Sequence, residues 1–375
     1  MIFAFILVLL IYGGANFYIA KRLFRFINSR YDRINTILFT AIYIFFALTL
    51  IIGFIPLPFR INGIMRFIGM YWIGAGMYLL IFFLLADFFI KLGKTAKIIN
   101  TAVLPRVRFY SGLTVILLTA AVVAYGMYNT NHIKQVSYEI QLKNAVLNNM
   151  KIVLISDLHL GEINSEKHLH NIVQMINSQN PDIVCLAGDI FNDNYYSIRN
   201  PQRAVDLFRS IESTYGVYAA LGNHDAGRTF HKMIDLLEKS NITVLKDEYR
   251  IIDGRLALFG RLDHRPIGGF GPFKRQDITE TIVSVGASMP VVVMDHNPVN
   301  IREYGSEVDL ILSGHTHRGQ VFPGSLVTKA INIIDYGHYQ KDANIPQVIV
   351  TSGVNTWGPP MRIGTNNEIV SILLR

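Results

Sequence analysis

The run IVLISDLH at residues 152–159 combines an apolar strand with a polar turn. Residues 152–156 are too uniformly apolar for a sheet with one face in water, which is typical of a strand covered on both faces. Asp157 and His159 follow directly, so two side chains that can bind metals lie at the carboxyl end of this predicted strand. The same order returns farther along the chain, and it predicts an α/β domain with polar residues at one edge.

Polar residues follow four more predicted strands in this way. These junctions are Gly188-Asp189 after residues 183–187, Gly222-Asn223-His224-Asp225 after 217–221, Asp295-His296-Asn297 after 291–294, and Gly314-His315-Thr316-His317 after 310–313. Residues after the strand ends converge on one crevice in an open α/β sheet, so the five junctions are expected to form one site. One such junction alone is an ordinary turn or a core histidine, but five in order are hard to explain that way.

Further strands and helices are predicted around the junctions. The strands lie at residues 136–142, 256–259, 347–351 and 368–374, and the helices at residues 168–177 and 201–211. Residues 136–142 alternate between apolar and polar side chains, which is typical of an edge strand.

The junctions offer carboxylates, imidazoles and one amide, a set of ligands that favours Mn²⁺, Fe or Zn²⁺. The only cysteine, Cys185, lies inside a predicted strand, which excludes an internal disulfide and a thiolate-rich metal site. The candidate ligands outnumber the three or four of a single ion, so we expect two divalent ions that share an oxygen ligand. Such a pair is typical of displacement at phosphorus by water.

The composition divides the chain into two parts. Of its 375 residues, 51% are hydrophobic and 17% are charged. Up to Ile133 there are 12 Lys and Arg against two Asp, whereas the remainder has 23 basic and 25 acidic residues. The net charge of +8 therefore belongs to the apolar part, and we predict no nucleic-acid groove. The predicted domains are a membrane domain at residues 1–133 and an α/β domain at residues 134–375.

Four apolar stretches in the first part are each long enough to cross a bilayer. They run from Ile2 to Ala20, Asn35 to Ile55, Phe67 to Ile90 and Phe109 to Tyr128. The first and third loops carry five basic residues each and the second carries two, and basic loops stay on the cytoplasmic side. We predict a multi-pass protein of the cytoplasmic membrane with its α/β domain outside the cytoplasm. Asp87 is expected to pair with Lys91 one turn later.

The motifs make the chain resemble the calcineurin-like metallophosphoesterase superfamily, in its membrane-anchored bacterial form. They are Asp157-x-His159, Gly188-Asp189, Gly222-Asn223-His224-Asp225, His296 and Gly314-His315-x-His317, in the order of the family. The resemblance covers the polar part of the chain and implies a four-layer α/β/β/α sandwich rather than a doubly wound sheet. Residues 357–364 are similar to a C-terminal stretch of membrane-associated bacterial members.

The resemblance also implies a role for each site residue. One ion would be bound by Asp157, His159 and His317, the other by Asn223, His296 and His315, with Asp189 as the bridge. His224 would protonate the leaving oxygen or stabilise its charge. The implied activity is hydrolysis of a phosphomonoester or phosphodiester, and a lipid or envelope phosphate is one candidate substrate.

Two positions depart from the pattern of many relatives. The acid that orients the histidine is expected three positions after Asp189, but that position is Asn192 and the acid follows at Asp193. Arg318 stands where membrane-type relatives often have glycine, and it would either bind an anionic phosphoester oxygen or lie on the surface.

Two other functions fit parts of the sequence. A degenerate metal-binding sensor or scaffold on a membrane anchor would have lost ligands, whereas all seven are present here. A transporter with a regulatory domain would need paired charges or a polar helix face in the spans, and the sequence shows neither. The oligomeric state is left open.

Overall fold

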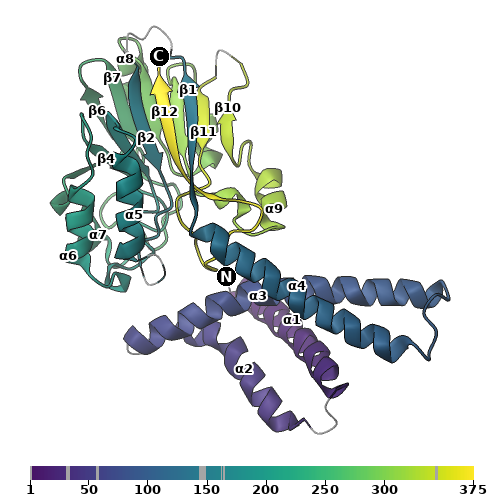
Figure 1. The fold of residues 1–375 in the computed structure, drawn as a ribbon. Coiled ribbons are helices and arrows are strands. Elements are labelled where there is room, and N and C mark those ends of the chain that lie inside the picture. The colour runs from purple at the N-terminus through teal and green to yellow at the C-terminus, as the bar shows by residue number, and fades with distance from the viewer. Residues whose placement is uncertain are drawn as a thin grey trace. The chain divides into compact units, whose positions relative to one another are not determined.

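The computed structural model describes residues 2–30, 34–55, 59–142, 149–161, 163, 165–342 and 345–375 (Figure 1). The chain forms two units, one of residues 1–127 with 358–360 and one of residues 128–357 with 361–375. The division into a membrane domain and an α/β domain between residues 133 and 134 remains a prediction from the sequence.

The first unit is built from four apolar helices. They are α1 (Ile2–Asn28), α2 (Thr36–Ile52), α3 (Phe59–Thr95) and α4 (Leu104–Thr130), whose last residues belong to the second unit. Three segments are long and apolar enough to cross a membrane, namely Ile6–Asn28, Ile61–Thr95 and Leu104–Thr130. Three of the four predicted spans are therefore confirmed as helices of full length, and the other, α2, is an apolar helix that is shorter.

The exception is α2, which has 17 residues. At 1.5 Å per residue it extends about 26 Å, less than the roughly 30 Å of a bilayer core. The helix begins after Asn35, whose side chain accepts a hydrogen bond from the backbone N–H of Leu38. It ends at Gly53, where the Nε of Arg66 donates to the carbonyl over 2.7 Å. The helix thus begins where the apolar run begins but ends three residues before it, at the cap that Gly53 forms.

The expected partner of Asp87 is also corrected. Its carboxylate lies 2.6 Å from the guanidinium of Arg22 and accepts a hydrogen bond of 2.6 Å from the hydroxyl of Tyr18. Both partners lie on α1, which contacts α3. Packing of α1 against α3 thus places the guanidinium of Arg22 beside Asp87. The pairing with Lys91 that spacing predicted is wrong.

The second unit contains two sheets of six strands each (Figure 1). The first sheet has the order β1 (Ile133–Ile140), β12 (Asn367–Leu374), β2 (Met150–Ile155), β3 (Ile183–Ala187), β4 (Val217–Ala220) and β5 (Ile242–Val244). The second has the order β10 (Gly337–Tyr339), β11 (Gln347–Val350), β9 (Leu310–Ser313), β8 (Val291–Met294), β7 (Leu256–Gly260) and β6 (Glu248–Ile252). The helices are α5 (Glu166–Asn177), α6 (Pro201–Arg209), α7 (Phe230–Lys239), α8 (Thr279–Gly286) and α9 (Gly324–Ile331).

Burial on both faces explains the continuous apolar runs. In β2, Val153 and Ile155 belong to a core that includes side chains of α5, α6 and α7. Ile152 and Leu154 point to the opposite face, into a core shared with the second sheet. On the far side of the second sheet, a third core includes Ile282 of α8. These layers form the predicted α/β/β/α sandwich, and each fully buried aliphatic side chain contributes about 1.5–3 kcal/mol.

Six elements of this unit were not predicted, namely β5, β6, β10, α7, α8 and α9. Strands β5 and β10 have three residues each, and β6 has one buried residue, Ile252. Such strands carry too little periodicity to be recognised. Helix α7 does bury an apolar face at helical spacing, which is a signal that could have identified it.

Candidate metal centre

The seven predicted ligands lie in loops at the carboxyl ends of five strands. Three of these strands, β2, β3 and β4, belong to the first sheet, and β8 and β9 belong to the second. In chain order the residues are Asp157, His159, Asp189, Asn223, His296, His315 and His317. The site therefore takes side chains from the same end of both sheets.

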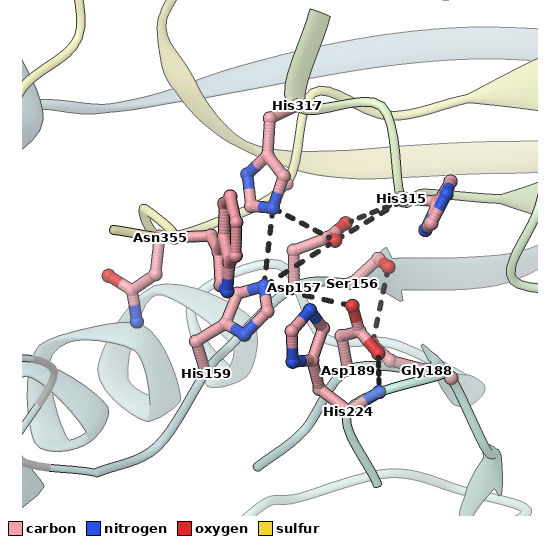
Figure 2. Close-up of polar contacts among 12 residues, drawn as sticks. Ser156, Asp157, His159, Gly188, Asp189, His224, His315, His317 and Asn355 are labelled. Carbon is pink, nitrogen blue, oxygen red and sulfur yellow. Dashed lines mark hydrogen bonds and ion pairs between the residues drawn. The ribbon is translucent and has the colours of Figure 1, made fainter. Parts of the chain in front are cut away.

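One cluster consists of Asp157, His159 and His317, all buried and turned towards one another (Figure 2). Nε2 of His317 lies 3.3 Å from Oδ1 of Asp157 and 3.2 Å from Nε2 of His159. The same carboxylate oxygen lies 3.9 Å from Nε2 of His159. Ligand–metal distances of about 2.0–2.2 Å place neighbouring ligands roughly 3–3.5 Å apart, so these three atoms fit the corners of one coordination shell.

The second cluster consists of Asp189, His296 and His315. Nε2 of His296 lies 3.0 Å from Oδ2 of Asp189 and 3.3 Å from Nδ1 of His315. Nδ1 of His296 lies 2.8 Å from the carbonyl oxygen of Ala187, to which it donates. This hydrogen bond fixes the ring and leaves Nε2 directed into the cluster.

Asp189 faces both clusters. Its Oδ2 atom lies 3.0 Å from Nε2 of His296 and 3.8 Å from Nε2 of His159. The seventh residue, Asn223, has a buried Oδ1 without a hydrogen-bond partner among the described residues. An unpaired buried acceptor destabilises a fold by about 1–3 kcal/mol, and a cation would satisfy it.

The donor set fits divalent ions. Burial lowers the pKa of His159 to about 3 and the pKa of His315 to about 4, so both rings are neutral at pH 7 and can bind a metal. Burial by itself would lower the pKa of His296 as well. The carboxylate of Asp189 has the larger effect, so the pKa of His296 is raised. A cation at this position would compete with a proton for Nε2 of His296. Oxygen and nitrogen ligands without a thiolate favour Mn²⁺, Fe or Zn²⁺.

Five of the seven residues have a left-handed backbone, which is rare outside glycine. The φ angles are 58° at Asp157, 43° at His159, 52° at Asp189, 70° at His315 and 48° at His317. Each of these residues stores of order 1–3 kcal/mol of strain, which persists only where the surrounding structure enforces it. Such strain is typical of side chains held in place for binding or catalysis.

The glycines of the motifs allow this close approach. Gly188 has φ 87°, and a Cβ there would lie 2.7 Å from the ring of His296. A Cβ at Gly314 would collide with the side chains of Ser156 and Asp157. The motif glycines are thus explained by the space that the ligands occupy.

His224 lies beside the first cluster, its ring centroid 5.0 Å from that of His159. Its Nδ1 lies 2.7 Å from Oδ1 of Asp193, and its backbone N–H donates to Oδ1 of Asp189 over 2.9 Å. The acid that contacts the histidine is therefore Asp193, one position after Asn192. Burial by itself would lower the pKa of His224, but the hydrogen bond that Nδ1 donates to Asp193 and the charge of Asp189 have the larger effect and raise the pKa.

The contacts of Arg362 were not predicted from the sequence. It is fully buried, and it donates from Nη1 to the carbonyl of His317 over 2.9 Å and from Nη2 to that of Ser352 over 2.6 Å. Nε donates to Oδ1 of Asn367 over 2.7 Å. The arginine therefore ties the loop of a predicted ligand to the C-terminal segment. The contact with His317 spans 45 residues, so no local pattern marks it.

Three other motif residues lie outside the two clusters. Asp225 accepts hydrogen bonds of 2.8 Å from the backbone N–H groups of Phe191 and Gly222, so it fixes two of the loops. Asp295 lies 2.6 Å from the guanidinium of Arg275. Arg318 stacks on the ring of Tyr336, with its guanidinium carbon 4.1 Å from the centroid.

Comparisons with known proteins give consistent matches. The family described as calcineurin-like phosphoesterase matches residues 150–319. A protein of Campylobacter jejuni described as an uncharacterized metallophosphoesterase is 31% identical over 100% of this chain and 98% of its own length. A transmembrane protein with metallophosphoesterase domain from Danio rerio is 29% identical, and the match covers 71% of this chain and 63% of that protein.

One further relative and one solved structure complete the comparison. A protein of Helicobacter pylori described as an uncharacterized metallophosphoesterase is 31% identical over 60% of this chain and 60% of its own length. The crystal structure of a dimetal phosphatase from Danio rerio matches with a TM-score of 0.34 and 13% identity, over 55% of this chain and 89% of that one.

Proposed function

The chain belongs to the calcineurin-like metallophosphoesterase family, and on that premise we propose that its α/β domain hydrolyses a phosphomonoester or phosphodiester with two divalent ions. The observation that carries the proposal is the pair of three-residue clusters, together with the carboxylate oxygen of Asp189 that faces both.

We assign the ligands as the family resemblance implies. Asp157, His159 and His317 would hold one ion, Asn223, His296 and His315 would hold the other, and Asp189 would be shared by the two. The pair of ions supplies Lewis acidity to the phosphoryl oxygens and lowers the pKa of the attacking water. The strained loops hold the ligands in this arrangement before the substrate arrives, which reduces reorganisation during the reaction.

His224 is the proposed proton donor. The carboxylate of Asp193 accepts from Nδ1, so Nε2 is the ring nitrogen available to a substrate. The raised pKa keeps a larger fraction of the ring protonated near neutral pH. A protonated ring beside the site can transfer a proton to the leaving oxygen as its bond to phosphorus breaks.

The unit of residues 1–127 with 358–360, which we call the helical unit, anchors the protein in a membrane. We propose that α2 crosses the bilayer as a fourth span, with local thinning to accommodate its length, so that the α/β domain lies outside the cytoplasm. If α2 did not cross, the domain would lie on the opposite side. Protease added to spheroplasts should therefore cut the domain while a cytoplasmic control stays intact. Protection of the domain until the membrane is permeabilised would reverse the topology.

A membrane anchor favours substrates that share the bilayer, so a lipid or envelope phosphate is the proposed class. The test is turnover by the purified full chain in detergent, with Mn²⁺, Fe²⁺ or Zn²⁺ added in turn. The panel contains a phosphomonoester, a phosphodiester and a lipid phosphate. We expect metal-dependent turnover that is abolished by a chelator. Stoichiometric metal binding without turnover of any of them would instead support a sensor or scaffold.

A further inference from the structure

Apart from the metal centre, the helical unit contains a cluster of charged side chains of its own, at the ends of two of its spans. A pocket of about 480 Å³ is lined by Arg22 and Arg25 of α1, by Ser29 in the turn after α1, and by Arg108 of α4. Its apolar walls are Phe26, Phe83, Pro105, Phe109 and Gly112. We call it the arginine pocket. Its volume lies in the range of pockets that bind small ligands.

The arginine pocket carries an excess of positive charge. Asp87 pairs with Arg22 at 2.6 Å and so compensates one of the three guanidinium groups. Arg25 and Arg108 form no ion pair with any described residue, and both are exposed. Two positive charges therefore face the pocket without a carboxylate partner among the described residues, and a phosphate ester would neutralise them.

Arg22 also retains an unused donor. Its side chain is 13% exposed, and its Nε is buried without a hydrogen-bond partner among the described residues. Its guanidinium carbon lies 5.6 Å from the ring centroid of Phe83, which leaves little freedom to reorient. A buried unpaired donor beside a pocket is satisfied by an acceptor that enters the pocket.

The walls show that the pocket suits a ligand with an apolar part. Phe26 and Phe109 stack with their centroids 5.3 Å apart, and they join α1 to α4 beside the arginines. This approach depends on Gly112, because a Cβ there would lie 2.6 Å from the ring of Phe26. The arginines come from the last part of the span Ile6–Asn28 and the start of the span Leu104–Thr130, where lipid headgroups would lie, and Phe83 comes from the span Ile61–Thr95.

We propose that the arginine pocket binds the phosphate of an anionic phospholipid. Guanidinium groups donate in pairs to phosphate oxygens, and the phenylalanine rings offer contacts to the glycerol backbone and the first methylene groups of the acyl chains. A free phosphate ester shares the charged part of this chemistry but gains nothing from the rings. The site thus gives the helical unit a lipid ligand in addition to its role as an anchor.

The test measures binding of fluorescent phosphatidic acid to the full chain in detergent. The buffer contains a chelator, so that phosphate binding and hydrolysis at the metal centre do not contribute. Unlabelled phosphatidic acid should displace the probe at least tenfold more effectively than glycerol 3-phosphate or diacylglycerol. Equal competition by glycerol 3-phosphate would overturn the lipid in favour of a soluble phosphate. Equal competition by diacylglycerol would show that the pocket binds lipids through its apolar walls alone and would overturn the phosphate site.

The matched variants use exposed arginines that no described ion pair holds. The double variant Arg25→Ala and Arg108→Ala should bind phosphatidic acid at least tenfold more weakly. The control is Arg106→Ala, which removes an exposed arginine from α4 that does not line the pocket. Equal affinity of the double variant and the unaltered chain would overturn the proposal. The single variant Arg108→Ala gives the same test should the double variant aggregate.

Discussion

The two units hold their ionisable groups in opposite ways. In the α/β unit, Asp157 and Asp189 are at most 2% exposed and face several histidines across loops with a strained backbone. In the helical unit, Asp87 is partly exposed and faces one arginine on a neighbouring helix. The first arrangement requires each side chain at a fixed position after a strand, so it produces a recognisable motif in the sequence. The second needs only that two helices pack together, so it leaves none.

The largest effect is expected at the residue that faces both clusters. Replacing Asp189 with Asn removes a charge that both proposed ions share, and turnover should fall by orders of magnitude while metal content drops from two ions per chain. Metal analysis and steady-state kinetics on the purified chain measure both quantities. Asp206→Asn, an exposed helical position, is the control. A variant with one ion or none at full activity would contradict a shared site.

A smaller loss is expected at His224. The variant His224→Ala should keep its metals and slow turnover by about 10²–10⁴, the usual contribution of a positioned proton donor. The loss should shrink for substrates with acidic leaving groups, which need little protonation. His231→Ala, an exposed histidine, serves as the control. Equal losses across leaving groups would indicate that His224 has a structural role only.

The contact with Asp193 predicts a change in pH dependence. The carboxylate raises the pKa of His224, so Asp193→Asn should lower that pKa and reduce the protonated fraction at any pH near neutral. The alkaline limb of the kcat profile should therefore move to lower pH, whereas the loss at acidic pH stays small. A uniform loss at every pH would show that Asp193 only supports the loop.

The smallest effect tests the helical unit. Asp87→Ala leaves Arg22 without its carboxylate, and we expect a loss of about 1 kcal/mol, the order of a polar contact between membrane helices. Lys91→Ala removes the partner that spacing alone predicts, and its Tm in detergent should match that of the unaltered chain. The reverse ranking of the two variants would restore the sequence-based pairing.

Prediction from the sequence succeeded where a residue is tied to a strand end. The junctions after β2, β3, β4, β8 and β9 were visible because a buried strand followed by a ligand has a local pattern. The contact between Asp193 and His224 does not follow from the usual spacing, since one extra residue in a loop changes which side chain faces inward. Arg362 and Arg22 act on partners far away in the chain, so their contacts follow from packing and not from spacing.

The position of β12 sets the order in which the molecule can assemble during synthesis. This strand, Asn367–Leu374, lies between β1 and β2 and pairs in register with both. Strand β1 follows α4 directly, yet it has no neighbour in the first sheet until residue 374 has left the ribosome. Arg362, which secures the loop of His317, emerges equally late. The helices are therefore available for membrane insertion long before the α/β domain can close, and the proposed metal centre is completed only after that.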